Sequence, residues 1–192
     1  MEKLIDRIQN SLSKEGITAR TNASRQWLFS KVKTLNVSSS NLMKDNNRLV
    51  DNTIVGKMYF FYYSPKLKDS LPYYDRFPLV IPIEQYSNGF LGLNLHYIHP
   101  KQRIILLDKL SEVISDKNYD ENTKLRINYS FLKSSSKFYE KGPCMKQYLF
   151  QFVKSRFLEI KSNEWDIASF LPAEDFQKAT TSKVWSESRK KY

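Results

Sequence analysis

The residues with the most chemical potential stand together in one short stretch, LPYYDRFPLVIPI. An aspartate and an arginine are neighbours there, and aromatic residues flank them; the five are Tyr73, Tyr74, Asp75, Arg76 and Phe77. An arginine beside aromatic rings can clamp a phosphate or carboxylate while the rings stack on a base. Tyrosine and arginine are also typical of hot spots in protein interfaces. A third alternative is a nuclease, in which the Asp-Arg pair supplies a general base and a charge-stabilising group.

A structural role for this stretch is the favoured interpretation. Aspartate side chains commonly accept hydrogen bonds from backbone amides in turns, and flanking prolines fix the shape of such a loop. We therefore expect Asp75 to cap a turn, while Tyr73, Tyr74 and Phe77 seal a small barrel. The surface formed by the five residues is a predicted docking site for a partner protein, with equal weight given to nucleic acid.

The chain carries a large positive charge that is spread along its length. Its 192 residues include 31 Lys and Arg against 20 Asp and Glu, which gives a net charge of +11. Such a surface attracts nucleic acid or an acidic protein partner without sequence specificity. If DNA is the ligand, the expected contacts are Lys66, Lys68, Arg76, Lys101 and Arg103.

The sequence lacks the patterns that identify several classes of site. The single cysteine, Cys144, excludes an intrachain disulfide and a multi-cysteine metal site, and we expect it to be a packed structural thiol. The two histidines, His96 and His99, stand without the further ligands that a metal needs. No glycine-rich phosphate loop and no G-x-S-x-G turn occurs. We therefore expect no catalytic residues, no cofactor and no metal.

The sequence also argues against a membrane protein. The first residues, MEKLIDRIQNSL, are charged and do not form the apolar core of a signal peptide. No stretch approaches the roughly 20 apolar residues that a membrane helix needs. We expect a soluble protein that is made inside the cell.

Residues 1–50 are expected to form a helical N-terminal arm. Before Gly16, which can end the first helix, apolar residues recur at helical spacing: Leu4, Ile5, Ile8 and Leu12. A second stripe follows a polar start at Thr21 and Asn22, and consists of Trp27, Leu28, Val32 and Leu35. The stretch SSSNLMKDNNRLV offers a capping serine for a short third helix.

Residues 51–99 are expected to form a small β-barrel. KMYFFYY and FPLVIPI are rich in aromatic and β-branched residues, and FLGLNLHYI follows a Ser-Asn-Gly turn, which predicts two strands and then a hairpin. Pro78 and Pro82 lack backbone donors, so their strand should lie at an edge or carry a bulge. Short, bent strands joined by one long loop favour a partly open barrel of the Src-homology-3 type.

Residues 100–192 are expected to form a helical C-terminal region that packs on the barrel, which makes the fold α+β. Pro100 suits a first helical position, and IILLDKLSEVI, KLRINYSFL and PCMKQYLFQFV place apolar residues at helical spacing. RFLEI favours a last short strand, and SNEWDIASFLP a helix that stops before Pro172. The final SKVWSESRKKY is expected to be a polar, basic tail.

Two of these stretches resemble known phage sequences. GKMYFFYYSPKLKDSLPYYDRFPLVIPI…GFLGLNLHYI and NEWDIASFLP are similar to late structural and assembly proteins of contractile-tailed phages of the T-even type. The resemblance covers about residues 50–185. Some of its members are DNA-end protectors, which cap the ends of the packaged genome, and others are virion components of the neck, tail or baseplate. The resemblance implies a non-enzymatic structural or assembly protein.

The leading hypothesis is a virion subunit that acts by protein–protein contact and is not an enzyme. Its partners would be other virion proteins, in a symmetric ring or complex, and its location would be the virion after synthesis in the host cytoplasm. The first alternative is a protector that binds the ends of the packaged DNA, whose contacts should weaken steeply with salt. The second alternative is the barrel-type nuclease that uses Asp75 and Arg76.

Overall fold

Three helices open the chain, as the apolar stripes predict. The structure is a computed structural model that describes residues 3–31, 34, 37–115, 118–139 and 142–189. The first helices are α1 at Leu4–Lys14, α2 at Asn22–Lys31 and α3 at Ser39–Leu42. The Ser38 hydroxyl accepts a hydrogen bond from the Asn41 amide, so the capping serine of α3 is confirmed. Val32 and Leu35 of the predicted second stripe lie outside the described residues.

Helix α1 shows how the local sequence sets an element. Its buried face, which packs into the main core, consists of Ile5, Ile8 and Leu12. The helix ends at Gly16, whose φ of +67° is a left-handed conformation that a residue without Cβ adopts at little cost. The amides of Gly16 and Ile17 donate to the carbonyl oxygens of Ser13 and Leu12, which completes a Schellman cap.

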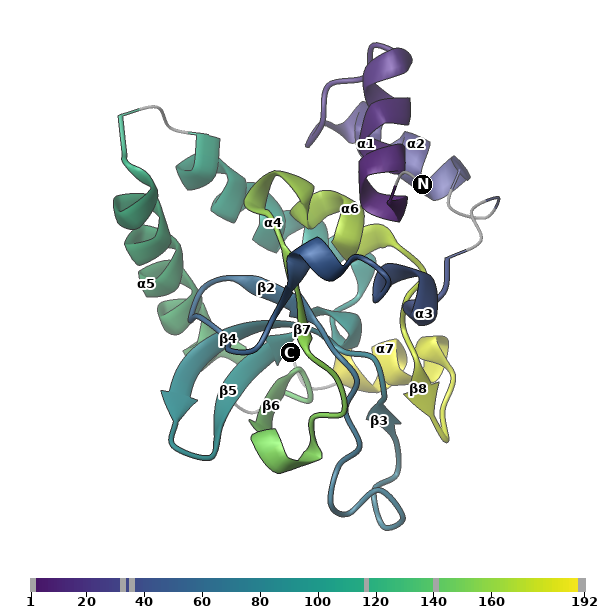
Figure 1. Cartoon of the computed structure of the whole chain (residues 1–192), viewed down its shortest axis with the longest axis vertical. Helices are drawn as coiled ribbons and strands as arrows, with labels where there is room; N and C mark the ends of the chain where they lie inside the picture. Colours follow the sequence, from purple (N-terminus) through teal and green to yellow (C-terminus); the bar gives the residue numbers. More distant parts are fainter. Residues whose placement is uncertain (1–2, 32–33, 35–36, 116–117, 140–141, 190–192) are drawn as a thin grey trace.

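A six-stranded antiparallel sheet forms the centre of the fold, in the order β1-β7-β2-β4-β5-β6. Its strands are β1 at Leu49–Val50, β2 at Met58–Phe60, β4 at Leu79–Tyr86, β5 at Gly89–Asn94, β6 at Met145–Leu149 and β7 at Phe157–Ile160. A second, two-stranded sheet pairs β3 at Tyr74–Asp75 with β8 at Phe176–Gln177. In Figure 1 the small sheet lies beside the large one.

The α+β class is confirmed, but the sheet does not close into a barrel. The outer strands β1 and β6 pair with β7 and β5, and within the described residues they do not pair with each other. The predicted Src-homology-3-like barrel of residues 51–99 is therefore not confirmed. The reason is that β6 and β7 come from residues 100–192. They pair with β5 and β2, so the strands of residues 51–99 gain neighbours without closing on themselves.

The hairpin of β4 and β5 follows the predicted turn. Tyr86 pairs with Gly89 across the intervening Ser-Asn dipeptide. The register shifts between Pro82 and Glu84, which confirms the predicted bulge, because proline has no amide to donate to the ladder. The alternative prediction, that this strand lies at an edge of the sheet, is wrong, because β4 lies between β2 and β5.

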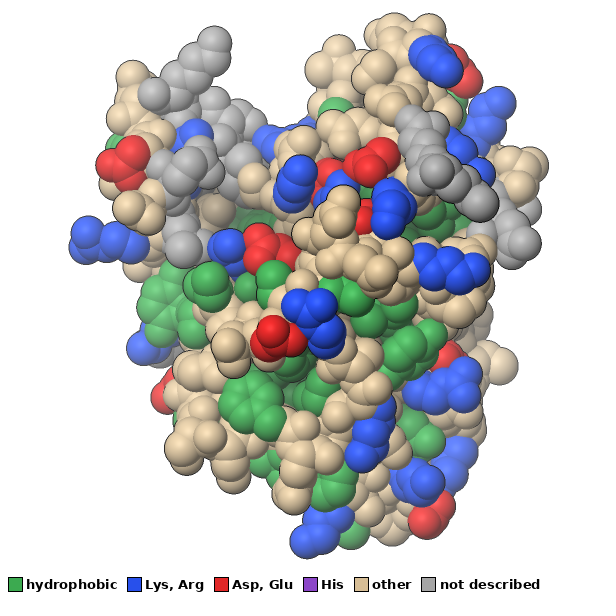
Figure 2. Space-filling view, in the orientation of Figure 1, with side chains coloured by type: hydrophobic (Ala, Val, Ile, Leu, Met, Phe, Trp, Pro, Cys, Tyr) green, Lys and Arg blue, Asp and Glu red, His purple; other side chains and the backbone are tan. Residues whose placement is uncertain are grey.

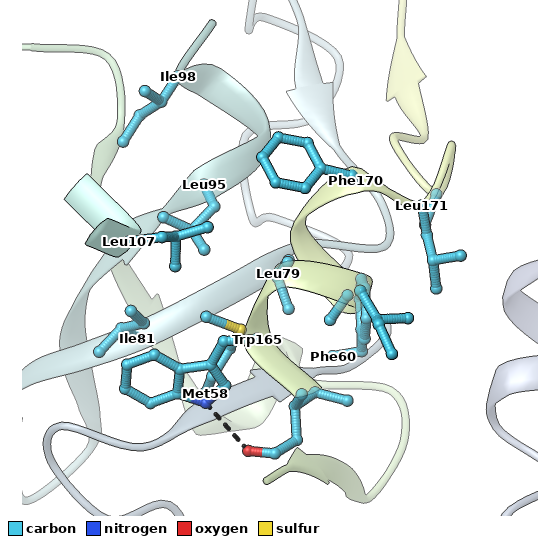
Figure 3. Packing of buried hydrophobic residues seen from close by; sticks show 14 of the residues in the cluster. Met58, Phe60, Leu79, Ile81, Leu95, Ile98, Leu107, Trp165, Phe170 and Leu171 are labelled. Atoms are coloured by element: carbon cyan, nitrogen blue, oxygen red, sulfur yellow. Dashed lines mark hydrogen bonds between the residues drawn. The ribbon is translucent and has the colours of Figure 1, made fainter. Parts of the chain in front are cut away.

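Alternate side chains of the sheet enter two different cores. Figure 3 shows the main core, to which β2 and β4 contribute Met58, Phe60, Leu79 and Ile81. The opposite face carries a smaller aromatic cluster, which consists of Tyr59, Phe61, Tyr63, Val80, Phe90, Tyr148 and Phe157. Because successive residues of a strand point to opposite faces, the single run KMYFFYY supplies both cores.

The described residues after β5 form four helices: α4 at Pro100–Ser115, α5 at Glu121–Tyr139, α6 at Trp165–Phe170 and α7 at Thr181–Arg189. Pro100 opens α4 and α6 ends before Pro172, as predicted. In Figure 1, α1 and α2 lie above α6, the sheet lies below it, and α5 stands at one side. α6 covers the main core with the indole of Trp165 and the ring of Phe170 (Figure 3).

The segment PCMKQYLFQFV is largely a strand and not a helix, which corrects the prediction. Met145 to Leu149 pair with Leu93 to Gly89 of β5, and a short 3-10 turn follows at Phe150–Phe152. Tyr148 enters the aromatic cluster while Gln147 is exposed. Cross-strand pairing thus outweighs the helical spacing of the apolar residues. Cys144, just before the strand, is fully buried, as expected of a packed thiol.

The end of the described chain is a packed helix, not the polar tail predicted from SKVWSESRKKY. Val184 of α7 is fully buried. The indole Nε1 of Trp185 donates a hydrogen bond to the backbone oxygen of His96 at 2.8 Å. The short strand predicted from RFLEI is confirmed as β7.

Arginines fix the first two helices to the rest of the fold. Arg48 Nη2 lies 2.6 Å from Asp6 Oδ1 in α1, and the same guanidinium binds Glu164. Arg25 Nε in α2 lies 3.0 Å from Asp166 Oδ2 in α6. Burial raises the pKa of Asp166, and the nearby Arg25 charge opposes this shift. The N-terminal helices are therefore joined to the body by ion pairs as well as by apolar packing.

Candidate nucleic-acid interface

Asp75 caps a turn from a buried position, which confirms the structural role expected of it. Its side chain is almost fully buried, and its Oδ1 accepts a hydrogen bond from the Phe77 amide at 3.1 Å. This bond closes the turn between β3 and β4. Its Oδ2 accepts from Asn94 Nδ2 at 3.1 Å, so the carboxylate also joins the small sheet to β5.

His96 is the second partner of the Asp75 carboxylate. The His96 Nδ1 atom lies 2.7 Å from Asp75 Oδ2, and both side chains are inaccessible to solvent. Because a carboxylate accepts hydrogen bonds, this contact places the hydrogen of a neutral imidazole on Nδ1. Nε2 then carries a lone pair, and it has no hydrogen-bond partner among the described residues. This buried pair was not predicted from the sequence.

Asn94 links this pair to a tyrosine of β6. Its Nδ2 donates to the Tyr148 hydroxyl at 3.0 Å, and its Oδ1 accepts from the His96 amide at 2.9 Å. Burial raises the pKa of Tyr148 well above its usual value, so this hydroxyl is neutral at physiological pH. The four side chains of Asp75, Asn94, His96 and Tyr148 form one hydrogen-bond network, called here the Asp75 network.

A cavity with tyrosine walls lies against this network. Its volume is about 150 Å³, and we call it the tyrosine pocket; it is lined by Tyr63, Pro65, Leu71, Tyr73, Tyr74, Asp75, Asn94, Tyr97, Lys146, Gln147 and Tyr148. The Lys146 ammonium lies 4.7 Å from the centre of the Tyr97 ring, a cation–π contact. Burial and the hydrogen-bonded Glu187 carboxylate raise the pKa of Tyr73 to about 12. The pocket therefore offers flat, uncharged rings beside one cation.

The loop beside the pocket is held in shape by a lysine from the far end of the chain. Lys178 Nζ donates to the carbonyl oxygens of Lys68, Asp69 and Leu71, at 2.7, 2.8 and 3.2 Å. Pro65 and Leu71 of this loop line the pocket. The loop, residues 64–73, is thus fixed against the pocket, and its exposed lysines are presented next to it.

A second concave site, the lysine cleft, lies where the start of α5 meets β7. Its volume is about 410 Å³, and it is lined by Gly56, Lys57, Asn122, Lys124, Asn128, Glu159, Ile160, Lys161, Ser162 and Trp165. Lys57 Nζ forms an ion pair with Glu159 Oε1 at 2.9 Å. The Oδ1 atom of buried Asn128 has no hydrogen-bond partner in the described part of the structure. No sequence motif pointed to this cleft, because its walls come from distant segments.

The nuclease interpretation requires Asp75 and Arg76 to act together, and the structure separates their side chains. Asp75 points into the buried network, whereas Arg76 is exposed and its Nε lies 2.7 Å from Asp175 Oδ2. The hydrogen bond with Asp175 and the charge of this carboxylate raise the pKa of the Arg76 guanidinium. The two neighbours in sequence therefore do not form a joint site.

The predicted docking surface is only partly at the surface. Tyr73 and Tyr74 are half-buried and line the pocket, and Arg76 is exposed. Asp75 and Phe77 are buried, which corrects their assignment as docking residues; the Phe77 ring stacks on Phe60 with ring centres 5.1 Å apart. A side chain that seals the core is not available to a partner.

Four of the five predicted DNA contacts are exposed, and the fifth is not. Lys66, Lys68, Arg76 and Lys101 lie on the surface. Arg103 is 1% exposed, and its guanidinium donates to the backbone oxygens of Ile98 and Ser169 and to Glu174 Oε1. Its assignment as a DNA contact is therefore corrected, because its hydrogen bonds are used to join α4 to the segments around α6.

Metal clusters and membrane helices are both missing from the described residues. They contain no group of three or more His, Cys, Asp and Glu side chains placed to hold a metal ion. Among the helices built from these residues, none has the length and apolar character that a bilayer crossing requires.

Comparison with known proteins places the chain in a family. No curated protein and no solved structure matches it. A family model described as the phage T4 terminal DNA protecting protein matches residues 2–188, which is nearly the whole chain. This match confirms the resemblance to proteins of T-even phages. The chain belongs to the family of phage T4 terminal DNA protecting proteins.

Proposed function

We propose that this protein binds the ends of linear double-stranded DNA and shields them from exonucleases. The observation that carries the proposal is the family match over residues 2–188, since the family is described by the protection of terminal DNA. This match favours the DNA-end-protecting alternative over the structural-subunit hypothesis. The neck, tail and baseplate locations stay predictions, as do other virion proteins as partners.

The distribution of charge supports contact with DNA. Several arginines are engaged in ion pairs: Arg25, Arg48 and Arg103 pair with carboxylates from largely buried positions, and Arg76 and Arg156 pair with carboxylates at the surface. Lysines such as Lys66, Lys68 and Lys101 are exposed. On the face shown in Figure 2, blue side chains are scattered and do not gather in one patch. A scattered lysine surface suits phosphate contacts that position DNA without reading its sequence.

The proposed action is binding and not catalysis. Protection needs a complex that outcompetes an exonuclease for the terminal base pairs, and binding alone achieves this. The Asp75 and Arg76 side chains have different partners, which supports binding as the proposed action of this stretch. We also propose that the protein acts on the ends of the packaged genome in the virion, as a protector of linear phage DNA.

A nuclease-protection assay tests this function. A linear duplex labelled at its end is incubated with a double-strand exonuclease, with and without the purified protein. We expect the protein to slow release of the label strongly, and the double variant Lys66→Ala/Lys68→Ala to protect less. The matched control is Lys14→Ala/Lys31→Ala, since both lysines are exposed on α1 and α2, which lie on the other side of α6 from the sheet (Figure 1). Equal release rates with and without saturating wild-type protein would refute the proposal.

A further inference from the structure

A DNA end differs from the interior of a duplex in ways that a protein can recognise. The last base pair is stacked on one side only, so its bases leave the helix at lower cost than internal bases. Internal phosphodiesters and grooves are alike along the duplex, whereas an end also carries terminal hydroxyl or phosphate groups and a base pair that opens more easily. A protein that prefers ends can therefore use a site for a group that only an end presents.

The size of the tyrosine pocket limits what it can hold. Its volume of about 150 Å³ is well below the roughly 300–1,000 Å³ of pockets for drug-sized ligands. One flat ring system fits such a space, whereas a base pair does not. The pocket is therefore matched to a single planar group.

The walls of the pocket suit a planar ring. Tyr73 and Tyr74 are half-buried and line the pocket, so their rings are available for stacking, whereas Tyr97 is buried in the wall with the Lys146 ammonium 4.7 Å from its ring centre. Base–tyrosine stacking tolerates any base, because every base has a π face. A protein that binds ends without reading their sequence needs this tolerance.

The floor of the pocket is rigid and polar. Asn94 and Asp75 are 0% and 4% exposed, and the Asp75 network fixes both side chains. The Tyr148 hydroxyl accepts from Asn94, and a tyrosine hydroxyl that accepts one hydrogen bond can also donate one. The carbonyl oxygens and ring nitrogens at the edge of a nucleobase are acceptors for such a hydrogen bond.

The charge around the pocket suits the backbone that carries the base. Lys146 lies in the pocket wall, and Lys66 and Lys68 are exposed on the loop that Lys178 holds beside it. A DNA strand that places its last base in the pocket brings its phosphates to this lysine-bearing rim. The pocket thus has one cation in its wall, and two exposed lysines follow Pro65, which lines it, within the next three residues.

From these observations we propose that the tyrosine pocket captures the unpaired terminal nucleobase of a DNA end. The inference rests on the proposed function and names the group by which an end is recognised. A protein side chain of a partner is the other class of ligand that aromatic walls could hold, and a fluorescent base within the DNA distinguishes the two.

The test places the fluorescent base 2-aminopurine at the terminal position or at an internal position of the same duplex. Binding is followed by anisotropy of a separate dye, and the environment of the base by 2-aminopurine fluorescence. We expect wild-type protein to change the signal of the terminal base but not of the internal base. Tyr74→Ala should reduce the preference for ends over circular DNA by about 5- to 150-fold, the range that loss of one base–aromatic stack implies.

Two further variants keep the test decisive. Gln147→Trp adds bulk at an exposed residue of the pocket wall and should abolish the terminal 2-aminopurine signal even if Tyr74→Ala fails to fold. Tyr86→Ala is the matched control, because this exposed tyrosine lies at the tip of the β4–β5 hairpin and does not line the pocket. Thermal unfolding confirms that each variant is folded.

The possible results distinguish base capture by the tyrosine pocket from the protection of DNA ends. If wild-type protein prefers ends and protects them but leaves terminal 2-aminopurine unchanged, base capture is wrong and the proposed function stands. If wild-type protein shows no preference for ends, the proposed function itself fails. Loss of the terminal signal in both pocket variants, with Tyr86→Ala unaffected, supports base capture.

Discussion

The tyrosine pocket and the lysine cleft hold their polar groups in opposite ways. In the pocket, Asp75 and Asn94 are buried and bound to each other and to His96. The cleft is larger, about 410 Å³ against 150 Å³, and three lysines line it, of which Lys57 pairs with Glu159. Buried Asn128 at the cleft also keeps an Oδ1 atom without a partner in the described structure.

This difference indicates two kinds of recognition. A site whose polar groups are fixed by one another selects a ligand by shape, because its geometry is set before binding. A wide site lined with lysines attracts phosphates over a distance, and salt screens that attraction. We therefore assign the preference for ends to the tyrosine pocket and expect the lysine cleft to contribute to affinity for DNA in general. Variants in the pocket and in the cleft test this assignment.

The largest expected effect comes from the Asp75 network. Asp75→Ala leaves buried His96, Asn94 and the Phe77 amide without their acceptor, so we expect a loss of about 3–5 kcal/mol in the free energy of unfolding. Urea denaturation followed by circular dichroism measures this. The control is Asp51→Ala, which breaks an exposed pair with Arg156 and should leave the midpoint almost unchanged. A loss below about 1 kcal/mol for Asp75→Ala would show that the network does not stabilise the pocket.

The next effect tests how closely β6, which lines the pocket, is packed on β5. A Cβ at Gly89 would lie 2.0 Å from the backbone oxygen of Tyr148, and backbone cannot move aside as a flexible side chain can. We expect Gly89→Ala to cost about 1–3 kcal/mol of stability, the usual range for overpacking. Ser87→Ala in the same turn is exposed and should change stability little. Equal midpoints for the two variants in thermal unfolding would contradict the close packing of β5 and β6.

The lysine cleft should change DNA affinity without changing the preference for ends. Lys124→Ala/Lys161→Ala removes two cations, so the slope of log affinity against log salt should become shallower by about 0.9 for each phosphate that the variant no longer neutralises. Anisotropy titrations at several salt concentrations measure this slope. The ratio of affinities for linear and circular DNA should stay as in wild type. A fall in that ratio would place end recognition in the cleft and not in the pocket.

The smallest effect concerns the start of α5, beside the cleft. The Asp120 carboxylate accepts a hydrogen bond from the Thr123 amide at 2.7 Å, and this bond lowers the Asp120 pKa below its usual 3.8. Since the folded-state pKa is depressed, the stabilisation is present above pH 3.8 and is lost as pH falls through the lower folded value. The NMR shift of the Thr123 amide should follow this titration.

The control for this titration is Asp120→Asn, which keeps an acceptor at the N-cap but does not titrate in this range. Its Thr123 amide shift should stay flat with pH. A wild-type midpoint at or above 3.8 would contradict the depressed pKa.

Features set by neighbouring residues could be predicted from the sequence. Gly16 ends α1, Ser38 caps α3, Pro82 marks a bulge, and Asp75 caps its turn, as expected. Each of these rests on a bond or a conformational preference within a few residues, which the sequence displays directly.

Features set by long-range pairing could not be predicted in the same way. The run PCMKQYLFQFV has helical spacing, but its pairing with β5 makes it a strand. His96 reaches Asp75 from 21 positions away, and Tyr148 reaches Asn94 from 54 positions away. Arg103 similarly looks like a surface cation in sequence, but the backbone oxygen of Ser169, 66 positions on, helps to hold it inside. No local pattern signals such contacts.

The candidate site was therefore found in part. The aromatic stretch around Tyr73 and Tyr74 drew attention to the region where the tyrosine pocket lies, because tyrosines are enriched in interfaces. The sequence could not show that Asp75 faces inward and Arg76 outward, since adjacent residues in extended chain point in opposite directions. The lysine cleft was missed, because Lys57, Lys124 and Lys161 meet only in the folded chain.

A competition experiment between linear and circular DNA tests whether the protein recognises ends. The protein is titrated into labelled linear duplex in competition with an unlabelled duplex of the same sequence, either linear or closed into a circle, at low and moderate salt. If the protein recognises ends, the linear competitor should displace the label far better than the circle, and the difference should persist at moderate salt. Equal competition by the two forms, lost as salt rises, would show a basic protein that binds DNA without regard to its ends.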